Sequence, residues 1–131
     1  LNKKKLSFIG FGGHGNQVRD LIHIDDVCEI ILKQIKKFSK IKNELFNIGG
    51  GLKNSLSLKD LNEKCKIITK NNVVLTKIKK TSIYDIPYYV TDNKKIKKFY
   101  KWEPKKNIDL ILEDINNWLT SNKLILKKYF K

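Results

Sequence analysis

The chain of 131 residues is long enough for one domain with a modest hydrophobic core. It carries 28 Lys or Arg residues against 13 Asp or Glu, a formal net charge of +15. No apolar run reaches the roughly 18 residues of a transmembrane helix, and the two distant cysteines support neither a metal site nor a disulfide framework. The cysteine pattern suits a reducing cytoplasm, and because the chain starts at Leu1 and contains no methionine, we expect a piece of a longer protein.

The kind of positive charge argues against specific nucleic-acid binding. Arg19 is the only arginine, and the lysines are spread along nearly every segment. Specific base recognition relies on the planar fork of arginine and on clustered basic residues. A diffuse lysine field predicts only weak attraction to polyanions, so a small lysine-rich nucleic-acid-binding protein is kept as an alternative of a different class.

The first predicted element contains a glycine pattern that imitates a cofactor site. Gly10, Gly12 and Gly15 have G-x-G-x-x-G spacing after an apolar run. In a dinucleotide-binding fold such a turn must open a helix, whose N-terminus faces the pyrophosphate. The residues after Gly15 lack a helical apolar stripe and are rich in Val and Ile. We therefore predict a hairpin of residues 6–11 and 17–24 instead of a cofactor turn.

Cap residues and apolar spacing predict the remaining elements, and strands alternate with helices, which indicates an α/β protein with mixed strand directions. Short strands are expected at 45–48, 73–78 and 88–90. The expected helices begin at Asp25 or Asp26 (with an apolar stripe to Phe38), at Ser57 (through Thr69), at Asp92 (before Trp102) and at Asn107 (with a stripe to Leu119).

Candidate catalytic residues are few. His14 is expected in a turn, and His23 is expected to form a local hydrogen bond beside the helix cap. Helix capping accounts for Asp25 and Asp26 without a catalytic role. Cys65 falls on an apolar helical stripe and is expected to pack in the interior.

Arg19 is the strongest candidate for a ligand-binding residue. In a strand it shares a face with Leu21 and His23. A lone arginine among lysines indicates that its geometry is needed, as in bidentate contact with a phosphate or carboxylate. The alternative is a structural ion pair with an aspartate.

Several segments together resemble a known family. They are QVRDLIHIDDV, FNIGGG, NSLSL and YYVTDNKKIKKFYKWEP, within a match from about Leu6 to Trp118. These segments are similar to the C-terminal half of the extended short-chain dehydrogenase/reductases, the NAD-dependent nucleotide-sugar epimerases and dehydratases. IGFGGHGNQVRDLIHIDD and FNIGGGLKNSLSL are most similar to a subgroup that epimerises CDP-sugars at C2.

The resemblance implies both a fold and a site. The fold would be the C-terminal substrate-binding portion of an extended short-chain dehydrogenase/reductase, lacking the N-terminal Rossmann core. Residues 1–120 would form this portion, with 45–49 as the last strand of the cofactor-domain sheet, and 121–131 would be a basic tail. Arg19 would contact the substrate diphosphate, and Gln17 and Val18 would line the same pocket.

Two departures from the family limit what this chain can do. Ser82 stands where a second phosphate-binding arginine is usual, and Lys79 or Lys80 could replace it only as a point charge. The catalytic Tyr-x-x-x-Lys pair is absent. We therefore expect no catalytic or cofactor-binding residue here, and no activity from this chain alone. By resemblance, the intact enzyme would be a homo-oligomer that uses NAD for transient hydride transfer on a CDP-sugar; 4-epimerisation and dehydration of another nucleotide sugar are kept as alternatives.

Overall fold

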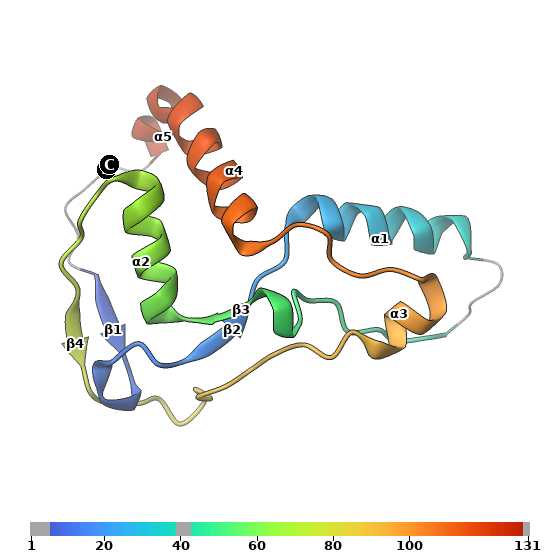
Figure 1. Ribbon diagram of the computed structural model, residues 1–131, viewed down its shortest axis with the longest axis horizontal. Coiled ribbons are helices and arrows are strands. Elements are labelled where there is room, and N and C mark those ends of the chain that lie inside the picture. Colours follow the sequence, from blue (N-terminus) through green and yellow to red (C-terminus); the bar gives the residue numbers. More distant parts are fainter. Residues whose placement is uncertain (1–5, 39–42, 130–131) are drawn as a thin grey trace.

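A computed structural model describes residues 6–38 and 43–129 and shows a mixed α/β protein with short strands, as predicted (Figure 1). None of the described helices is long and apolar enough to cross a membrane. The elements are β1 (Ser7–Ile9), a 3-10 turn (Phe11–Gly13), β2 (Val18–Asp20), α1 (Ile24–Lys36), a second 3-10 turn (Leu52–Asn54), β3 (Ser55–Ser57), α2 (Leu58–Thr69), β4 (Thr76–Ile78), α3 (Lys94–Tyr100), α4 (Ile108–Ser121) and α5 (Lys123–Tyr129).

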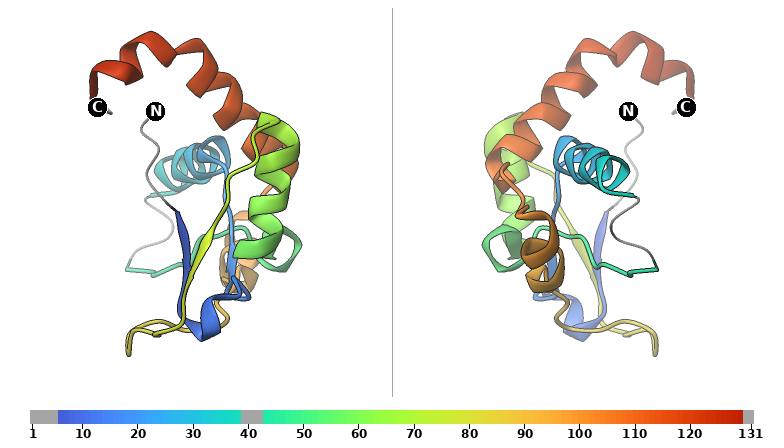
Figure 2. Two further views of the ribbon diagram at one scale, coloured as in Figure 1. Left: turned by 90° about the vertical axis from the view of Figure 1, so that its left-hand side faces the viewer. Right: turned by 90° about the vertical axis from the view of Figure 1, so that its right-hand side faces the viewer.

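The strands pair with distant partners, so the predicted hairpin is wrong. β1 pairs in parallel with β4, and the two strands run side by side (Figure 2). β2 pairs antiparallel with β3. Both predicted segments are extended, but a turn with left-handed residues at 10–13 and at Gly15 separates them and directs the chain away from a hairpin. Apolar patterning identifies extended chain, whereas the strand partner depends on contacts far along the sequence.

Other predicted strands are shorter than expected or absent. Residues 45–48 are not a strand, because the described part of the chain places no strand beside them. Of residues 73–78 only β4 is regular, and residues 88–90 contribute a single parallel bridge between Val18 and Tyr88. The expected basic tail contains the helix α5.

The predicted cap residue is the N-cap at two of the four helices. Ser57 Oγ accepts a hydrogen bond from the Asp60 N–H (3.1 Å), and Asn107 Oδ1 accepts from the Leu110 N–H (2.9 Å). At α3 the N-cap is Asn93 instead of the predicted Asp92, although Asp92 Oδ1 accepts from the Lys94 N–H (2.8 Å). At α1 the prediction is wrong: His23 is the N-cap, with Nδ1 accepting from the Asp25 N–H (3.0 Å).

Asp26 has a different role from the predicted cap. It is buried, and its carboxylate accepts from the N–H groups of Lys105 and Lys106 (3.2 and 3.1 Å). Asp26 therefore ties the start of α1 to the segment that leads into α4.

The hydrophobic core lies between α1 and α3. Ile30 of α1 and Ile96 and Tyr100 of α3 pack with Trp102, while Ile22, Phe46 and Ile48 pack against them from the side. The Phe46 ring meets Tyr100 edge to face, with 5.4 Å between centroids. Among the described residues, the β1–β4 end of the molecule has no fully buried large side chain.

Candidate functional site

Arg19 on β2 is held by three hydrogen bonds. Its Nη2 donates to Asp85 Oδ1 and to the Ile86 carbonyl, both at 2.8 Å, and Nη1 donates to the Val18 carbonyl at 2.7 Å. The structure therefore contains the aspartate ion pair that the sequence left as an alternative. The Arg19 side chain is still 34 % exposed.

Arg19 lines a cavity of about 290 Å³, here called the Arg19 cavity. The cavity opens between β1, β2 and the start of α2. A paired arginine with one open side can hold a ligand anion, because the same donors serve carboxylate and phosphate oxygens. Its lining residues are Ser7, Ile9, Gln17, Arg19, Leu58 and Asp85.

Gln17 lines the Arg19 cavity and carries a buried acceptor without a partner among the described residues. The side chain is 3 % exposed, and its Nε2 donates to the Ile9 carbonyl at 2.5 Å. A carbonyl can only accept, so the amide nitrogen must face Ile9 and Oε1 must face away. Among the described residues Oε1 has no hydrogen-bond partner. A buried acceptor without a partner costs about 1–3 kcal/mol, which a ligand donor would recover.

Val18 is close to this site but does not line it. Its N–H donates to the Pro87 carbonyl (3.0 Å), and its carbonyl accepts from the Tyr89 N–H (3.1 Å). Val18 thus holds residues 87–89 against β2, next to Asp85. Its predicted contact with substrate remains a prediction.

The structure also locates the position of the missing second arginine. Ser82 is exposed and lies outside the Arg19 cavity, where its Oγ accepts from the Tyr84 N–H. Lys79 and Lys80 do not line the cavity either. The sequence reasoning missed Ser7, Ile9 and Leu58 as lining residues; the strand alternation of residues 7–9 was the available signal.

A second charged cluster joins α1 to α4. Lys106 Nζ lies 2.7 Å from Asp25 and 3.2 Å from Asp114, and His23 Nε2 lies 3.2 Å from the same Asp114. The hydrogen bond from Lys106 lowers the pKa of Asp25 and raises that of Lys106. The local bond predicted for His23 is present. These contacts account for the cluster as a structural junction.

Other candidates offer no catalytic arrangement. His14 is exposed at the end of the glycine-rich turn. Cys28 is exposed, whereas Cys65 is half-buried and burial raises its pKa. Within residues 6–38 and 43–129, no group of three His, Cys, Asp or Glu side chains could hold a metal ion. The glycine-rich turn leads into β2 and not into a helix, so it does not fit a dinucleotide pyrophosphate.

Comparison with known proteins defines the class. The model of the NAD dependent epimerase/dehydratase family matches residues 1–49. A UDP-glucose 4-epimerase from Thermotoga maritima, solved with UDP-glucose, is 28 % identical with a TM-score of 0.66, covering 85 % of this chain and 33 % of that one. The chain belongs to the NAD-dependent epimerase/dehydratase family.

Within the family, one relative is similar over most of this chain. CDP-paratose 2-epimerase from Salmonella typhi is 31 % identical over 109 residues, which is 83 % of this chain and 32 % of that protein. An epimerase structure from Methanothermobacter thermautotrophicus shares the fold, with a TM-score of 0.81 at 18 % identity over 97 % of this chain and 36 % of that one. The chain spans about a third of the length of these relatives.

Proposed function

We propose that this chain is the substrate-binding portion of an NAD-dependent nucleotide-sugar epimerase, with a CDP-paratose 2-epimerase as the intact parent. One observation carries the proposal: Arg19 and Gln17 line one cavity, and Gln17 Oε1 has no hydrogen-bond partner among the described residues. The 31 % identity to CDP-paratose 2-epimerase supports the choice of a CDP-sugar over other nucleotide sugars.

In this proposal Arg19 binds the diphosphate of the substrate through the open side of its guanidinium. Asp85 and the Ile86 carbonyl fix the orientation of Nη2, so the side chain loses little conformational freedom when the ligand arrives. Gln17 Oε1 accepts from an N–H or O–H group of the ligand. Because Ser82 occupies the position of the usual second arginine, Arg19 is the single arginine that binds the diphosphate.

The reaction belongs to the intact parent. Bound NAD would accept hydride from a sugar carbon and return it to the opposite face of the ring. The catalytic Tyr-x-x-x-Lys pair is absent from this sequence. We therefore propose that the chain alone neither turns over substrate nor binds NAD tightly, and that the parent is a cytoplasmic homo-oligomer.

The surface of α1 supports the proposed division into domains. Three apolar side chains of this helix are exposed: Ile31 and Ile35 of the predicted apolar stripe, and Leu32 beside it. Leu45, in the extended segment that follows, is exposed as well. Apolar side chains gathered on one helix face are typical of a surface that packs against further protein. The family match ends at residue 49. Residues 45–49 would thus form the last strand of the cofactor-domain sheet, within a substrate-binding portion of residues 1–120 followed by the basic segment 121–131.

The proposal is tested by titrating the chain with CDP and UDP in a calorimeter. We expect CDP to bind more tightly than UDP, and Arg19→Lys to weaken CDP binding about tenfold although the charge is kept. Lys79→Gln, an exposed charge outside the cavity, serves as the matched control and should change the affinity by less than about twofold. Equal CDP affinity for the wild type and Arg19→Lys would show that Arg19 serves only its ion pair with Asp85.

Two further measurements separate the alternatives. Turnover of CDP-paratose by the intact parent would support 2-epimerisation, whereas turnover of another nucleotide sugar would support a 4-epimerase or dehydratase. Steeply salt-dependent binding to generic single-stranded DNA, with no effect of CDP, would support the lysine-rich nucleic-acid-binding protein instead.

A further inference from the structure

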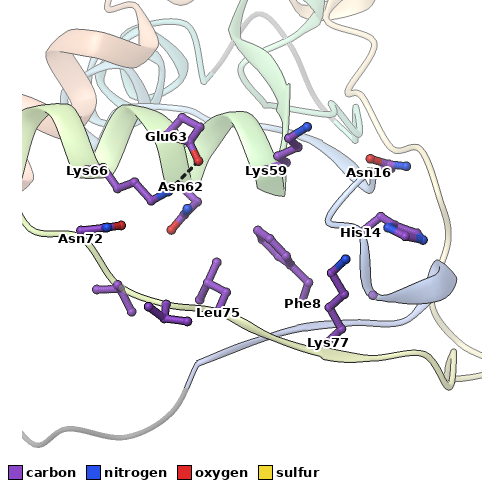
Figure 3. Close-up of a pocket in the computed structure, with 13 residues that line it drawn as sticks. Phe8, His14, Asn16, Lys59, Asn62, Glu63, Lys66, Asn72, Leu75 and Lys77 are labelled. Carbon is purple, nitrogen blue, oxygen red and sulfur yellow. Dashed lines mark hydrogen bonds and ion pairs between the residues drawn. The ribbon is translucent and has the colours of Figure 1, made fainter.

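A second and larger cavity lies between α2, the β1–β4 ribbon and the glycine-rich turn. Its volume is about 500 Å³, within the range of small-molecule sites. Figure 3 shows the Phe8 ring of β1 and Leu75, just before β4, directed toward α2, with Asn62 projecting from the helix above them. It is called here the Phe8 cavity. The side chains that give it chemical character are Phe8, His14, Asn16, Lys59, Asn62, Glu63, Lys66, Asn72, Leu75 and Lys77.

This cavity is separate from the Arg19 cavity. Successive side chains of a strand point to opposite faces, and Ser7 and Ile9 line the Arg19 cavity whereas Phe8 lines the other. The two cavities share no lining residue. A ligand in the Phe8 cavity would therefore leave Arg19 and Gln17 uncovered.

The glycine-rich turn is built closely around the Phe8 cavity. A Cβ at Gly15 would lie 2.8 Å from the Phe8 ring, and one at Gly13 would lie 2.8 Å from Lys77 Cβ. Both glycines also have φ of +72°, which side chains rarely adopt. The turn can close on the aromatic ring and on the stem of Lys77 only because these positions lack a side chain. The close approach at Gly15 and Gly13 therefore fixes the positions of Phe8 and of the Lys77 stem in the cavity wall.

The charges around the Phe8 cavity favour an anion. Glu63 is paired with Lys66 at 2.8 Å, and this hydrogen bond lowers the pKa of Glu63. Lys59 and Lys77 have no ion-pair partner among the described residues. Three lysines against one glutamate leave a positive surplus beside an apolar floor.

The remaining lining groups indicate what else the ligand carries. The Phe8 ring offers a flat apolar surface for stacking, which is worth about 1–3 kcal/mol for a nucleic-acid base. Asn16, Asn62 and Asn72 each offer an amide donor and acceptor at the rim. Such a mixture suits a planar, polar-edged ring joined to a phosphate.

We propose that the Phe8 cavity binds a small phosphorylated ligand with a planar ring, of the size of a nucleoside monophosphate. Lys59 and Lys77 neutralise the phosphate, Phe8 stacks on the ring, and the asparagine amides contact its polar edges. The site is independent of the diphosphate site at Arg19.

The test uses the isotope-labelled full chain, titrated with AMP and with inorganic phosphate while backbone amide resonances are followed. AMP should shift the amides of residues 13–16 and 59–66 and leave 17–19 and 85–86 unchanged. AMP should bind at least about fivefold more tightly than inorganic phosphate, because only AMP carries the stacking ring. Phe8→Leu should abolish that preference.

Charge variants separate a built site from the general positive field. Lys77→Gln should weaken AMP binding about fivefold or more, whereas Lys79→Gln, which removes an equal charge outside both cavities, should change it less than about twofold. Lys77 is exposed, so its variant is expected to fold, and a thermal melt checks this. Equal losses in the two lysine variants, shifts confined to residues 17–19 and 85–86, or equal affinities for AMP and phosphate would each overturn the proposal.

Discussion

The two ends of this molecule are held together by different forces. At the α1–α3 end, Ile30, Ile96 and Trp102 are almost completely buried and pack against one another. At the β1–β4 end, β4 is exposed along its whole length, and the contacts are strand hydrogen bonds, close glycine approaches and the Arg19–Asp85 pair. Apolar packing therefore dominates one end, whereas backbone and polar contacts dominate the other.

This difference separates stability from binding. Both candidate cavities lie at the polar end, where side chains can be replaced without opening the core. Substitutions at the packed end should change the free energy of unfolding. Substitutions at the polar end should mainly change ligand affinity, except where a glycine permits a close approach.

The largest expected effect comes from the two tryptophans, which form a matched pair. Trp102 is 1 % exposed in the core, whereas Trp118 on α4 is 57 % exposed. Trp102→Ala should lower the free energy of unfolding by about 3–5 kcal/mol, because it removes a large buried side chain and leaves a cavity. Trp118→Ala should change it by less than about 1 kcal/mol. Urea unfolding measures both, and equal losses would show that packing around Trp102 does not dominate stability.

A glycine pair tests how far the polar end depends on close approach. Gly15 and Gly51 both have positive φ, but an added Cβ would lie 2.8 Å from the Phe8 ring at Gly15 and 3.3 Å from its nearest neighbour at Gly51. Gly51→Ala should cost about 1 kcal/mol for the backbone conformation alone. Gly15→Ala should cost about 1–3 kcal/mol more, because the Phe8 ring must move. Similar unfolding midpoints for the two variants would contradict the fixed position assigned to that ring.

Sequence reasoning succeeded where the information was local. Ser57 and Asn107 were identified as caps because a cap hydrogen bond spans only three residues. The glycine turn was predicted to continue into extended chain, and it leads into β2. The family resemblance placed Arg19, Gln17 and Val18 at one pocket; Arg19 and Gln17 line one cavity, Val18 does not, and their contact with substrate stays a prediction.

Sequence reasoning failed where distant segments decide the structure. Residues 7–9 and 18–20 were recognised as extended, but their partners lie at 76–78 and 55–57. The structure was needed to identify Asp85 as the ion-pair partner of Arg19, because the two residues are 66 positions apart in the sequence. The residues that line the Phe8 cavity come from a strand, a turn and a helix, and no local sequence pattern predicts that these elements lie side by side.

Asp85→Asn should give a smaller effect and tests whether Arg19 is available to a ligand. The variant keeps an oxygen that can accept from Arg19 Nη2 but removes a negative charge next to the proposed diphosphate. We expect CDP affinity to rise about two- to fivefold, or about 0.5–1 kcal/mol. Because both side chains are about one-third exposed, the stability loss should stay below about 1 kcal/mol. Unchanged CDP binding would indicate that the guanidinium serves Asp85 alone, whereas weaker binding would show that the orienting role of Asp85 outweighs its charge.

The smallest expected effect is on the acid dependence of stability, through Asp25 at the junction of α1 and α4. The hydrogen bond from Lys106 lowers the pKa of Asp25 from its ordinary value of 3.8 in the folded chain. The folded state therefore binds the proton of Asp25 less readily than the unfolded state does. The contribution of this carboxylate to the free energy of unfolding is present above pH 3.8 and is lost as the pH falls through the folded pKa.

Asp25→Asn should consequently lower the unfolding midpoint near neutral pH and converge with the wild type in acid, below the folded pKa of Asp25. Lys106→Gln should produce the same change in slope, and adding Asp25→Asn to it should have little further effect, because the two side chains form one pair. Urea unfolding at a series of pH values measures these slopes. Additive effects of the two substitutions would show that Asp25 and Lys106 act independently, and the junction would then depend on the buried Asp26 and its two backbone hydrogen bonds.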